Sequence, residues 1–229
     1  VDGEVVVVHT TGSQTEVGST PNTYKLEWKK ASSKNYKLKE DSIGTLTVTE
    51  QTIDPGKDPD KPNPNYSGVT INNPSNSVYD GKEHKWSPAV TDKEGNALVE
   101  GTDYTVEYST SDFRNVTGTI TVTITGIGNY TGSHNVEYQI TKRNVTLTSA
   151  TASKVYDKTP LTNSNVTVEG DGFAKLEGAS YHVTGSQTNV GDSDNEFTYK
   201  LNDDTKASNY NIEVKFGKLY ITTQDGQVI

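Results

Sequence analysis

The chain has 229 residues, a formal net charge of -9 at pH 7, and neither cysteine nor methionine. An acidic chain is repelled by phosphate backbones and anionic lipid, which argues against nucleic acid and membrane surfaces as partners. The absence of cysteine excludes disulfides, thiolate zinc sites and cysteine nucleophiles.

Hydrophobic residues make up only 30% of the chain. That is too little for one thick core, but it suits several thin sheets that each bury one face. No stretch approaches the roughly 20 apolar residues of a membrane span, so no membrane insertion is expected. The lack of a start methionine indicates a piece of a longer polypeptide.

The first predicted module covers residues 1–53 and is recognised by an internal repeat. The segment Gly12–Gly18 returns as Gly185–Gly191, and both copies lead into a Tyr-Lys-Leu run, at Tyr24–Leu26 and Tyr199–Leu201. The later copy is preceded by about 40 residues of its own module, but the earlier copy has only the few residues before Gly12. The first module therefore lacks opening strands and leaves a sheet edge unpaired. We expect that edge to be filled by another chain in a strand-sharing contact, rearranged locally, or frayed.

A Pro/Asp-rich linker is predicted over residues 54–65, where four prolines in twelve residues favour extended, semi-rigid geometry. No comparable break separates the second module, 66–143, from the third, 144–224. We therefore expect a flexible first joint and a stiffer second joint. Residues 225–229 form a short tail.

The local pattern predicts strands throughout. Period-two alternation marks residues 104–108, 119–124 and 144–148, and Asp80-Gly81 and Gly95-Asn96 are turn signals that accept positive φ. No window carries a sustained helical stripe. The predicted fold class is all-β: tandem small modules, each a β-sandwich or barrel-like sheet, in an elongated array.

Tyrosine motifs recur at corresponding places in the modules. A Tyr-Asp pair opens the second and third modules, and an Asn-Tyr pair recurs later in all three, so a structural packing role is predicted. The motif residues are Tyr79, Asp80, Tyr156, Asp157, Tyr36, Tyr130 and Tyr210.

These motifs resemble a known family. The runs Val78–Lys82, Gly101–Val106, Gly128–Gly132 and Tyr138–Lys142 are similar to the MBG/YDG repeat modules of bacterial, largely Gram-positive, surface proteins. The third module resembles a variant in which Lys158 stands where the second has Gly81. The resemblance covers about 80% of the chain. It implies a cell-wall or cell-surface location, and the family name implies mucin binding.

Catalytic chemistry is not expected. Thirty acidic residues make chance carboxylate pairs inevitable, no metal-binding spacing links the four histidines, and no Gly-x-Ser-x-Gly elbow occurs. No cofactor is predicted. A bound calcium ion at residues 54–60 or 191–195 is an alternative to plain solvated turns. A Lys–Asn isopeptide bond between Lys154 or Lys158 and Asn209 or Asn211 is a separate hypothesis.

Two tryptophans are candidate sugar platforms, because they do not occupy repeated positions. Trp86 lies between charged and turn residues and is favoured over Trp28. The leading hypothesis is a non-catalytic structural spacer and adhesion module of a bacterial surface protein. The alternatives are a mucin- or glycan-binding module and an accessory module of a secreted polysaccharide-degrading enzyme.

Overall fold

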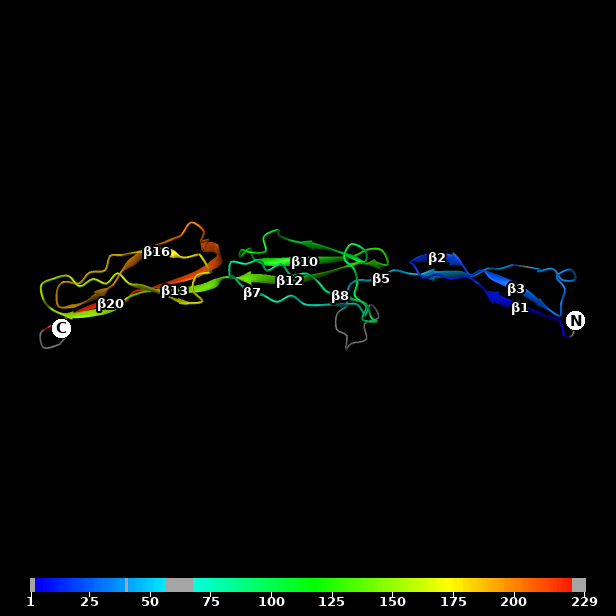
Figure 1. The fold of residues 1–229 in the computed structure, drawn as a ribbon, viewed down its shortest axis with the longest axis horizontal. Coiled ribbons are helices and arrows are strands. Elements are labelled where there is room, and N and C mark those ends of the chain that lie inside the picture. The colour runs from blue at the N-terminus through cyan, green and yellow to red at the C-terminus, as the bar shows by residue number, and fades with distance from the viewer. Residues whose placement is uncertain (1–2, 40, 57–67, 224–229) are drawn as a thin grey trace. The chain divides into compact units, whose positions relative to one another are not determined.

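The computed structural model describes residues 3–39, 41–56 and 68–223. Over these ranges the protein is built from strands and one 3-10 helix, η1 (Ala207–Asn209), without an α-helix, which confirms the all-β prediction. Most of the predicted linker, 57–65, and the tail lie outside the described residues. The strands are β1 (Val5–Thr10), β2 (Gly18–Pro21), β3 (Tyr24–Lys29), β4 (Thr45–Val48), β5 (Gln51–Thr52), β6 (Thr70–Ile71), β7 (Ser77–Val78), β8 (Val90–Thr91), β9 (Tyr104–Tyr108), β10 (Thr119–Gly126), β11 (Tyr130–Thr131), β12 (Ser133–Thr141), β13 (Arg143–Ser149), β14 (Ala152–Val155), β15 (Val166–Gly170), β16 (Ala179–Val183), β17 (Gly191–Asp194), β18 (Phe197–Leu201), β19 (Tyr210–Lys215) and β20 (Lys218–Thr222) (Figure 1).

The chain forms two compact units. Unit 1 comprises residues 1–73, 88–108 and 122–136, and unit 2 comprises residues 74–87, 109–121 and 137–229. Strands β10 and β12 run through the boundary, so each contributes residues to both units.

Unit 1 contains short antiparallel pairs, β1 with β3, β2 with β4, β6 with β8 and β9 with β10, and one parallel pair, β5 with β11. None of the described residues before Ile53 is buried. The apolar core of this unit therefore starts at Ile53. Its other members are Val69, Val90, Tyr104, Val122, Ile124 and Val136.

Unit 2 contains two three-stranded sheets. Strand β13 lies between β15 and β19, and strand β20 lies between β14 and β17. The β13–β19 and β14–β20 pairs are parallel, and β7 pairs in parallel with the end of β12. Alternate residues of β13 and of β20 are buried, because successive side chains of a strand face opposite sides. The fully buried members there are Val145, Leu147, Leu219 and Ile221.

The internal repeat is conformational as well as sequential, with a constant shift of 173 positions. Asn22 and Asn195 occupy equivalent places, since their N–H groups donate to the carbonyls of Gly44 and Gly217 at 2.7 and 2.8 Å. Strand β1 pairs with β3, and β2 with β4, in the registers of β16 with β18 and β17 with β20.

One predicted correspondence is displaced. The Tyr-Lys-Leu runs do not occupy equivalent positions, because Val8 pairs with Leu26 whereas Tyr181 pairs with Tyr199. Tyr24 therefore takes the place of Phe197. The register is set by the backbone pairing, which turns of equal length fix in both copies. The second Tyr-Lys-Leu run lies two residues later than that register, so the similarity of the two runs does not reflect equivalent positions.

Candidate functional site

The Tyr-Asp motif has the same backbone geometry in both of its copies. The Tyr79 N–H donates to the carbonyl of Thr141 at 2.9 Å, directly after the β7–β12 pair. The Tyr156 N–H donates to the carbonyl of Thr222 at 2.9 Å, directly after the β14–β20 pair. The motif thus ends a parallel strand pair in each case.

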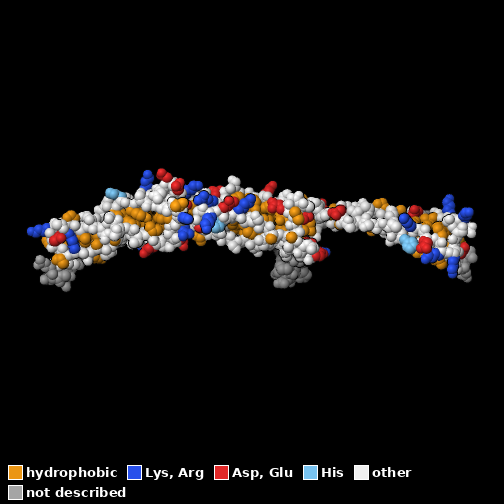
Figure 2. Space-filling view, in the orientation of Figure 1, with side chains coloured by type: hydrophobic (Ala, Val, Ile, Leu, Met, Phe, Trp, Pro, Cys, Tyr) orange, Lys and Arg blue, Asp and Glu red, His pale blue; other side chains and the backbone are white. Residues whose placement is uncertain are grey.

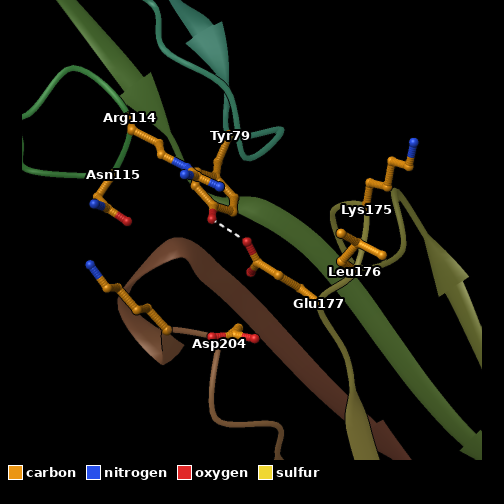
Figure 3. Close-up of a pocket in the computed structure, with 8 residues that line it drawn as sticks. Tyr79, Arg114, Asn115, Lys175, Leu176, Glu177 and Asp204 are labelled. Carbon is orange, nitrogen blue, oxygen red and sulfur yellow. Dashed lines mark hydrogen bonds between the residues drawn. The ribbon is translucent and has the colours of Figure 1, made fainter.

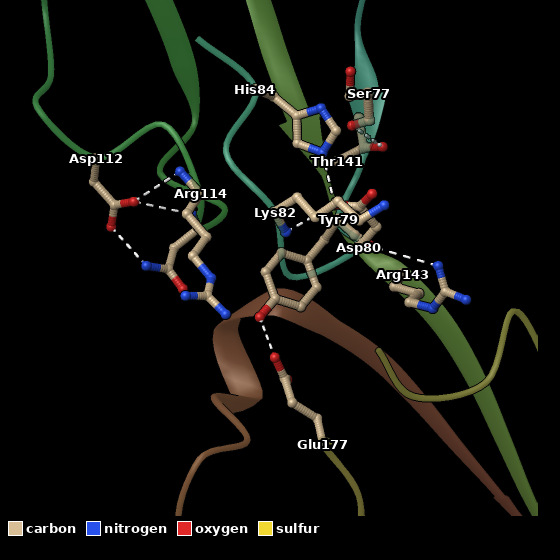
Figure 4. A network of polar contacts seen from close by, with 11 residues as sticks. Ser77, Tyr79, Asp80, Lys82, His84, Asp112, Arg114, Thr141, Arg143 and Glu177 are labelled. Carbon is tan, nitrogen blue, oxygen red and sulfur yellow. Dashed lines mark hydrogen bonds and ion pairs between the residues drawn. The ribbon is translucent and has the colours of Figure 1, made fainter. Parts of the chain in front are cut away.

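The aspartates of the motif fix the turn that follows. Each carboxylate accepts a hydrogen bond from the backbone N–H two residues later, at 2.9 Å. Asp80 also contacts His84 Nε2 at 2.8 Å (Figure 4), and Asp157 accepts from Lys154 Nζ at 2.8 Å. Burial acts to raise the pKa of Asp80, but the hydrogen bonds to its carboxylate outweigh it and lower that pKa. The Lys154 hydrogen bond is the largest cause that lowers the pKa of Asp157.

The two tyrosines of the motif differ in their surroundings. Tyr79 is 2% exposed and Tyr156 is 40% exposed. The Tyr79 hydroxyl donates to one carboxylate oxygen of Glu177 at 2.5 Å (Figure 3), and the Tyr210 hydroxyl donates to the other at 2.7 Å. The two rings meet edge to face, with centroids 5.5 Å apart. Glu177 therefore joins the Tyr-Asp motif of the second predicted module to the Asn-Tyr motif of the third.

Both hydroxyls in this cluster resist ionisation. Burial is the largest cause that raises the pKa of Tyr79, and the hydrogen bond to Glu177 adds to it. Burial likewise raises the pKa of Tyr210 well above its ordinary value. Neutral tyrosines that donate to a carboxylate are stable hydrogen-bond partners over the physiological pH range, and they offer no general base.

Asn209, the asparagine of the third Asn-Tyr pair, is fully buried beside this cluster. Its side-chain oxygen accepts from the Val116 N–H at 2.9 Å, and its amide nitrogen donates to the side chain of Asn115 at 2.9 Å. A polar group without solvent contact is stable only when it is hydrogen-bonded, and Asn209 meets that condition through a turn of the preceding module.

The second Asn-Tyr pair makes the same contact within unit 1. The Asn129 side chain accepts from the Val17 N–H at 3.3 Å and donates to Glu16 at 2.8 Å. The chain that leaves the first module runs parallel to the strand after Asn129, as β13 runs parallel to β19 after Asn209. Ile53 is fully buried there, and its N–H donates to the carbonyl of Thr131 at 2.8 Å. This pairing lies before the predicted linker, so the first joint has ladder hydrogen bonds that the sequence pattern did not indicate.

A polar hollow of about 370 Å³ adjoins the tyrosine cluster (Figure 3). Leu176 lies at its edge, 88% exposed and with a φ of 70°, a backbone region that non-glycine residues rarely adopt. The lining residues are Tyr79, Arg114, Asn115, Lys175, Leu176, Glu177, Asp204 and Lys206.

No family model, curated protein or solved structure matches this chain. Function therefore has to be argued from the geometry of the protein itself.

The two candidate sugar platforms lie in different settings. Trp28 is half-buried and stacks on Tyr36, with ring centroids 6.2 Å apart and planes at 23°. Both rings line a hollow of about 230 Å³, where Tyr36 also donates to Glu4. Trp86 is half-buried, and its backbone N–H donates to the Tyr138 hydroxyl at 3.3 Å.

Two of the groups considered for a crosslink have other partners. Lys154 Nζ donates to Asp157 and to Thr159, while Asn209 is bound by Asn115 and Val116, so this lysine and this amide are engaged elsewhere. Across the described residues, no group of three or more His, Asp and Glu side chains is arranged to hold a metal ion. The segment 54–60 lies partly outside them. No helix of the described chain is long and apolar enough to cross a membrane.

Sequence reasoning missed Glu177, which makes the central contact of the cluster. A signal was present, because the shift of 173 positions relates Glu177 to Glu4, and both accept a hydrogen bond from a tyrosine of an Asn-Tyr pair. The matching tyrosines, Tyr36 and Tyr210, are separated by one residue more than that shift. Tyr130, the third of the set, is half-buried on β11.

Proposed function

We propose that this chain is a non-catalytic spacer and adhesion segment of a bacterial surface protein, built from modules of the MBG/YDG type and located outside the cell. The motif residues support this role, because they hold strand ends, turns and joints in place. Intermixed acidic and basic side chains on the visible surface suit a solvent-exposed segment (Figure 2).

The observation that carries the proposal is the recurrence of one joint. An asparagine of the Asn-Tyr pair binds the turn of the preceding module at Val17 in unit 1 and at Val116 in unit 2. A spacer needs each module to be held to the next in a defined way, and a repeated side-chain contact beside a parallel strand pair supports that requirement.

The test is a distance measurement inside unit 2. The chain has no cysteine, so Ser111→Cys with Lys200→Cys gives two exposed labelling sites on parts of the second and third predicted modules. Pulsed electron resonance should give a narrow distance distribution that Asn209→Ala broadens. Asn211→Ala, which removes only an exposed hydrogen bond to Asn144, is the matched control and should leave it narrow. A broad distribution in the parent chain would overturn the spacer proposal.

Mucin or glycan binding is a second candidate, favoured by the stack of Trp28 on Tyr36 in its hollow. Aromatic faces of this kind can stack on sugar rings. The check is a screen of mucins and polysaccharides with the chain and with Trp28→Ala and Trp86→Ala. Saturable binding that Trp28→Ala abolishes would locate the site there, loss with Trp86→Ala alone would place it at Trp86, and no binding would leave the spacer role.

A further inference from the structure

Strand β4 of unit 1 has one unpaired edge, whereas its repeat equivalent does not. Within the described residues β4 pairs only with β2, but β20 pairs with β17 on one side and with β14 on the other. Leu219 and Ile221 of β20 are fully buried. Leu46 and Val48, their equivalents on β4, are only half-buried. An apolar face and a row of backbone groups are thus left uncovered on one side of β4.

Gly44, immediately before β4, indicates what is missing. At the equivalent Gly217 a side chain is excluded, because a Cβ would lie 2.4 Å from the carbonyl oxygen of Ser149 and 2.5 Å from the carbonyl carbon of Ala150. At Gly44 a Cβ would meet nothing within 4 Å, and its φ is not positive. Neither space nor backbone conformation in the described chain requires glycine there. A segment packed as Ser149 and Ala150 pack would require it.

Two hydrogen-bond donors also indicate that a segment like Ser149–Ala150 is missing beside β4. The Asn195 amide nitrogen donates to the carbonyl of Ala150 at 2.9 Å, and the Gly217 N–H donates to the Ser149 hydroxyl at 3.0 Å. Their equivalents are the Asn22 side chain and the Gly44 N–H, for which the described residues supply no such partner. Unit 1 therefore has the equivalent donors, but its described residues include no segment in the place that the β13–β14 segment takes in unit 2.

We propose that this face, made of Asn22, Gly44 and the free edge of β4, binds an extended peptide segment with the sequence character of Arg143–Val155. Such a segment has Val and Leu at alternate positions, then a Ser-Ala turn, then a second short strand. The second strand adds parallel to β4, as β14 adds to β20, with the residue equivalent to Ala152 opposite Leu46. This pairing repeats the one that β14 makes with β20 in unit 2. The proposal does not depend on the spacer role.

The test uses a fluorescent synthetic peptide of residues 143–157 titrated with the full chain and followed by anisotropy. We expect saturable binding, with amide shifts in nuclear magnetic resonance spectra confined to Asn22 and to residues 44–49. Gly44→Val should weaken binding by about tenfold or more without changing the melting temperature, because open space surrounds Gly44. A peptide with Leu147→Asp should bind correspondingly less.

Gly217→Val in the same chain is the matched contrast and should destabilise unit 2, since its Cβ would overlap the Ser149–Ala150 backbone. The proposal is overturned if the peptide does not bind saturably, or if Gly44→Val leaves its affinity unchanged. It is also overturned if the chain self-associates through β4, seen by sedimentation as a dimer that Gly44→Val dissociates and the peptide cannot compete, because the occupant would then be a second copy.

Discussion

At the residue scale, the two Tyr-Asp turns offer a direct comparison of glycine with lysine. Gly81 has a φ of 80°, and Lys158, at the same place after the second Tyr-Asp pair, has a φ of 69°. A side chain with a Cβ is strained there, and glycine is not. Lys158→Gly should therefore raise the free energy of unfolding by about 0.5–1 kcal/mol. Urea unfolding measures it.

Gly81→Ala is the reciprocal change and should destabilise the protein by a similar amount, about 1 kcal/mol. Its new Cβ would lie 3.6 Å from Ala174, an ordinary contact, so only the backbone conformation is tested. Equal stability of Lys158→Gly and the parent chain would show that the turn relaxes without cost.

The tyrosines bound to Glu177 predict an alkaline limit of stability. The pKa values of Tyr79 and Tyr210 are raised in the folded protein above the ordinary value of 10.0, chiefly by burial. The folded state then holds protons that the unfolded state releases above pH 10. The stabilisation is complete below pH 10 and is lost as the pH rises towards the folded pKa values.

Tyr210→Phe should accordingly flatten the fall of the unfolding free energy above pH 10, measured by urea titrations at a series of pH values. The ultraviolet absorbance of tyrosinate gives the ionisation directly. Tyr156→Phe is the control, because this tyrosine is exposed and lies outside the cluster. An equal effect of both variants would contradict the role of burial.

At the element scale, the buried asparagine at the start of β19 should matter more than its exposed neighbour. Asn209→Ala removes two hydrogen bonds and leaves the Val116 N–H without its acceptor, which should cost about 2–4 kcal/mol in unfolding free energy. Asn211→Ala removes one exposed hydrogen bond and should cost no more than about 1 kcal/mol. Urea unfolding of both variants tests the difference, and similar losses would sink the argument.

The strands themselves were predictable, because alternation needs only the side-chain period of a pleated strand. Residues 104–108, 119–124 and 144–148 all lie in strands, β9, β10 and β13. The positive φ of Gly81 and of Gly95 was also predictable from the turn signals. Strand partners were not, since pairing depends on turns whose geometry the letters do not specify. The displaced Tyr-Lys-Leu runs show this. Their similarity suggested an alignment of the two repeats that is two residues away from the true register, in which Asn22 is equivalent to Asn195.

The candidate site was predictable in part. The recurrence of the Tyr-Asp and Asn-Tyr pairs predicts a structural role for them, yet recurrence did not reveal that Tyr79 is buried and Tyr156 exposed. That difference arises from tertiary contact with Glu177, which lies 98 positions from Tyr79 in the chain. Such a long-range partner leaves no local pattern in the sequence.

At the scale of the whole molecule, the two joints fall in different compact units and share no residue. Ile53, with its pairing to Thr131, belongs to unit 1, and the Tyr79–Glu177–Tyr210 cluster belongs to unit 2. Weakening one joint should then leave the other unaffected. Repeated modules are stabilised mainly by themselves and their nearest neighbours, which leads to the same expectation.

Calorimetry of two single variants and their double variant checks this independence. Ile53→Ala empties a fully buried position and should cost about 2–5 kcal/mol, and Tyr79→Phe removes a hydrogen bond to a carboxylate and should cost about 1–3 kcal/mol. Each should shift a different unfolding transition, and the two losses should add to within about 0.5 kcal/mol. A larger coupling energy, or one transition moved by both variants, would mean that the chain unfolds as a single cooperative body and that its joints are not independent.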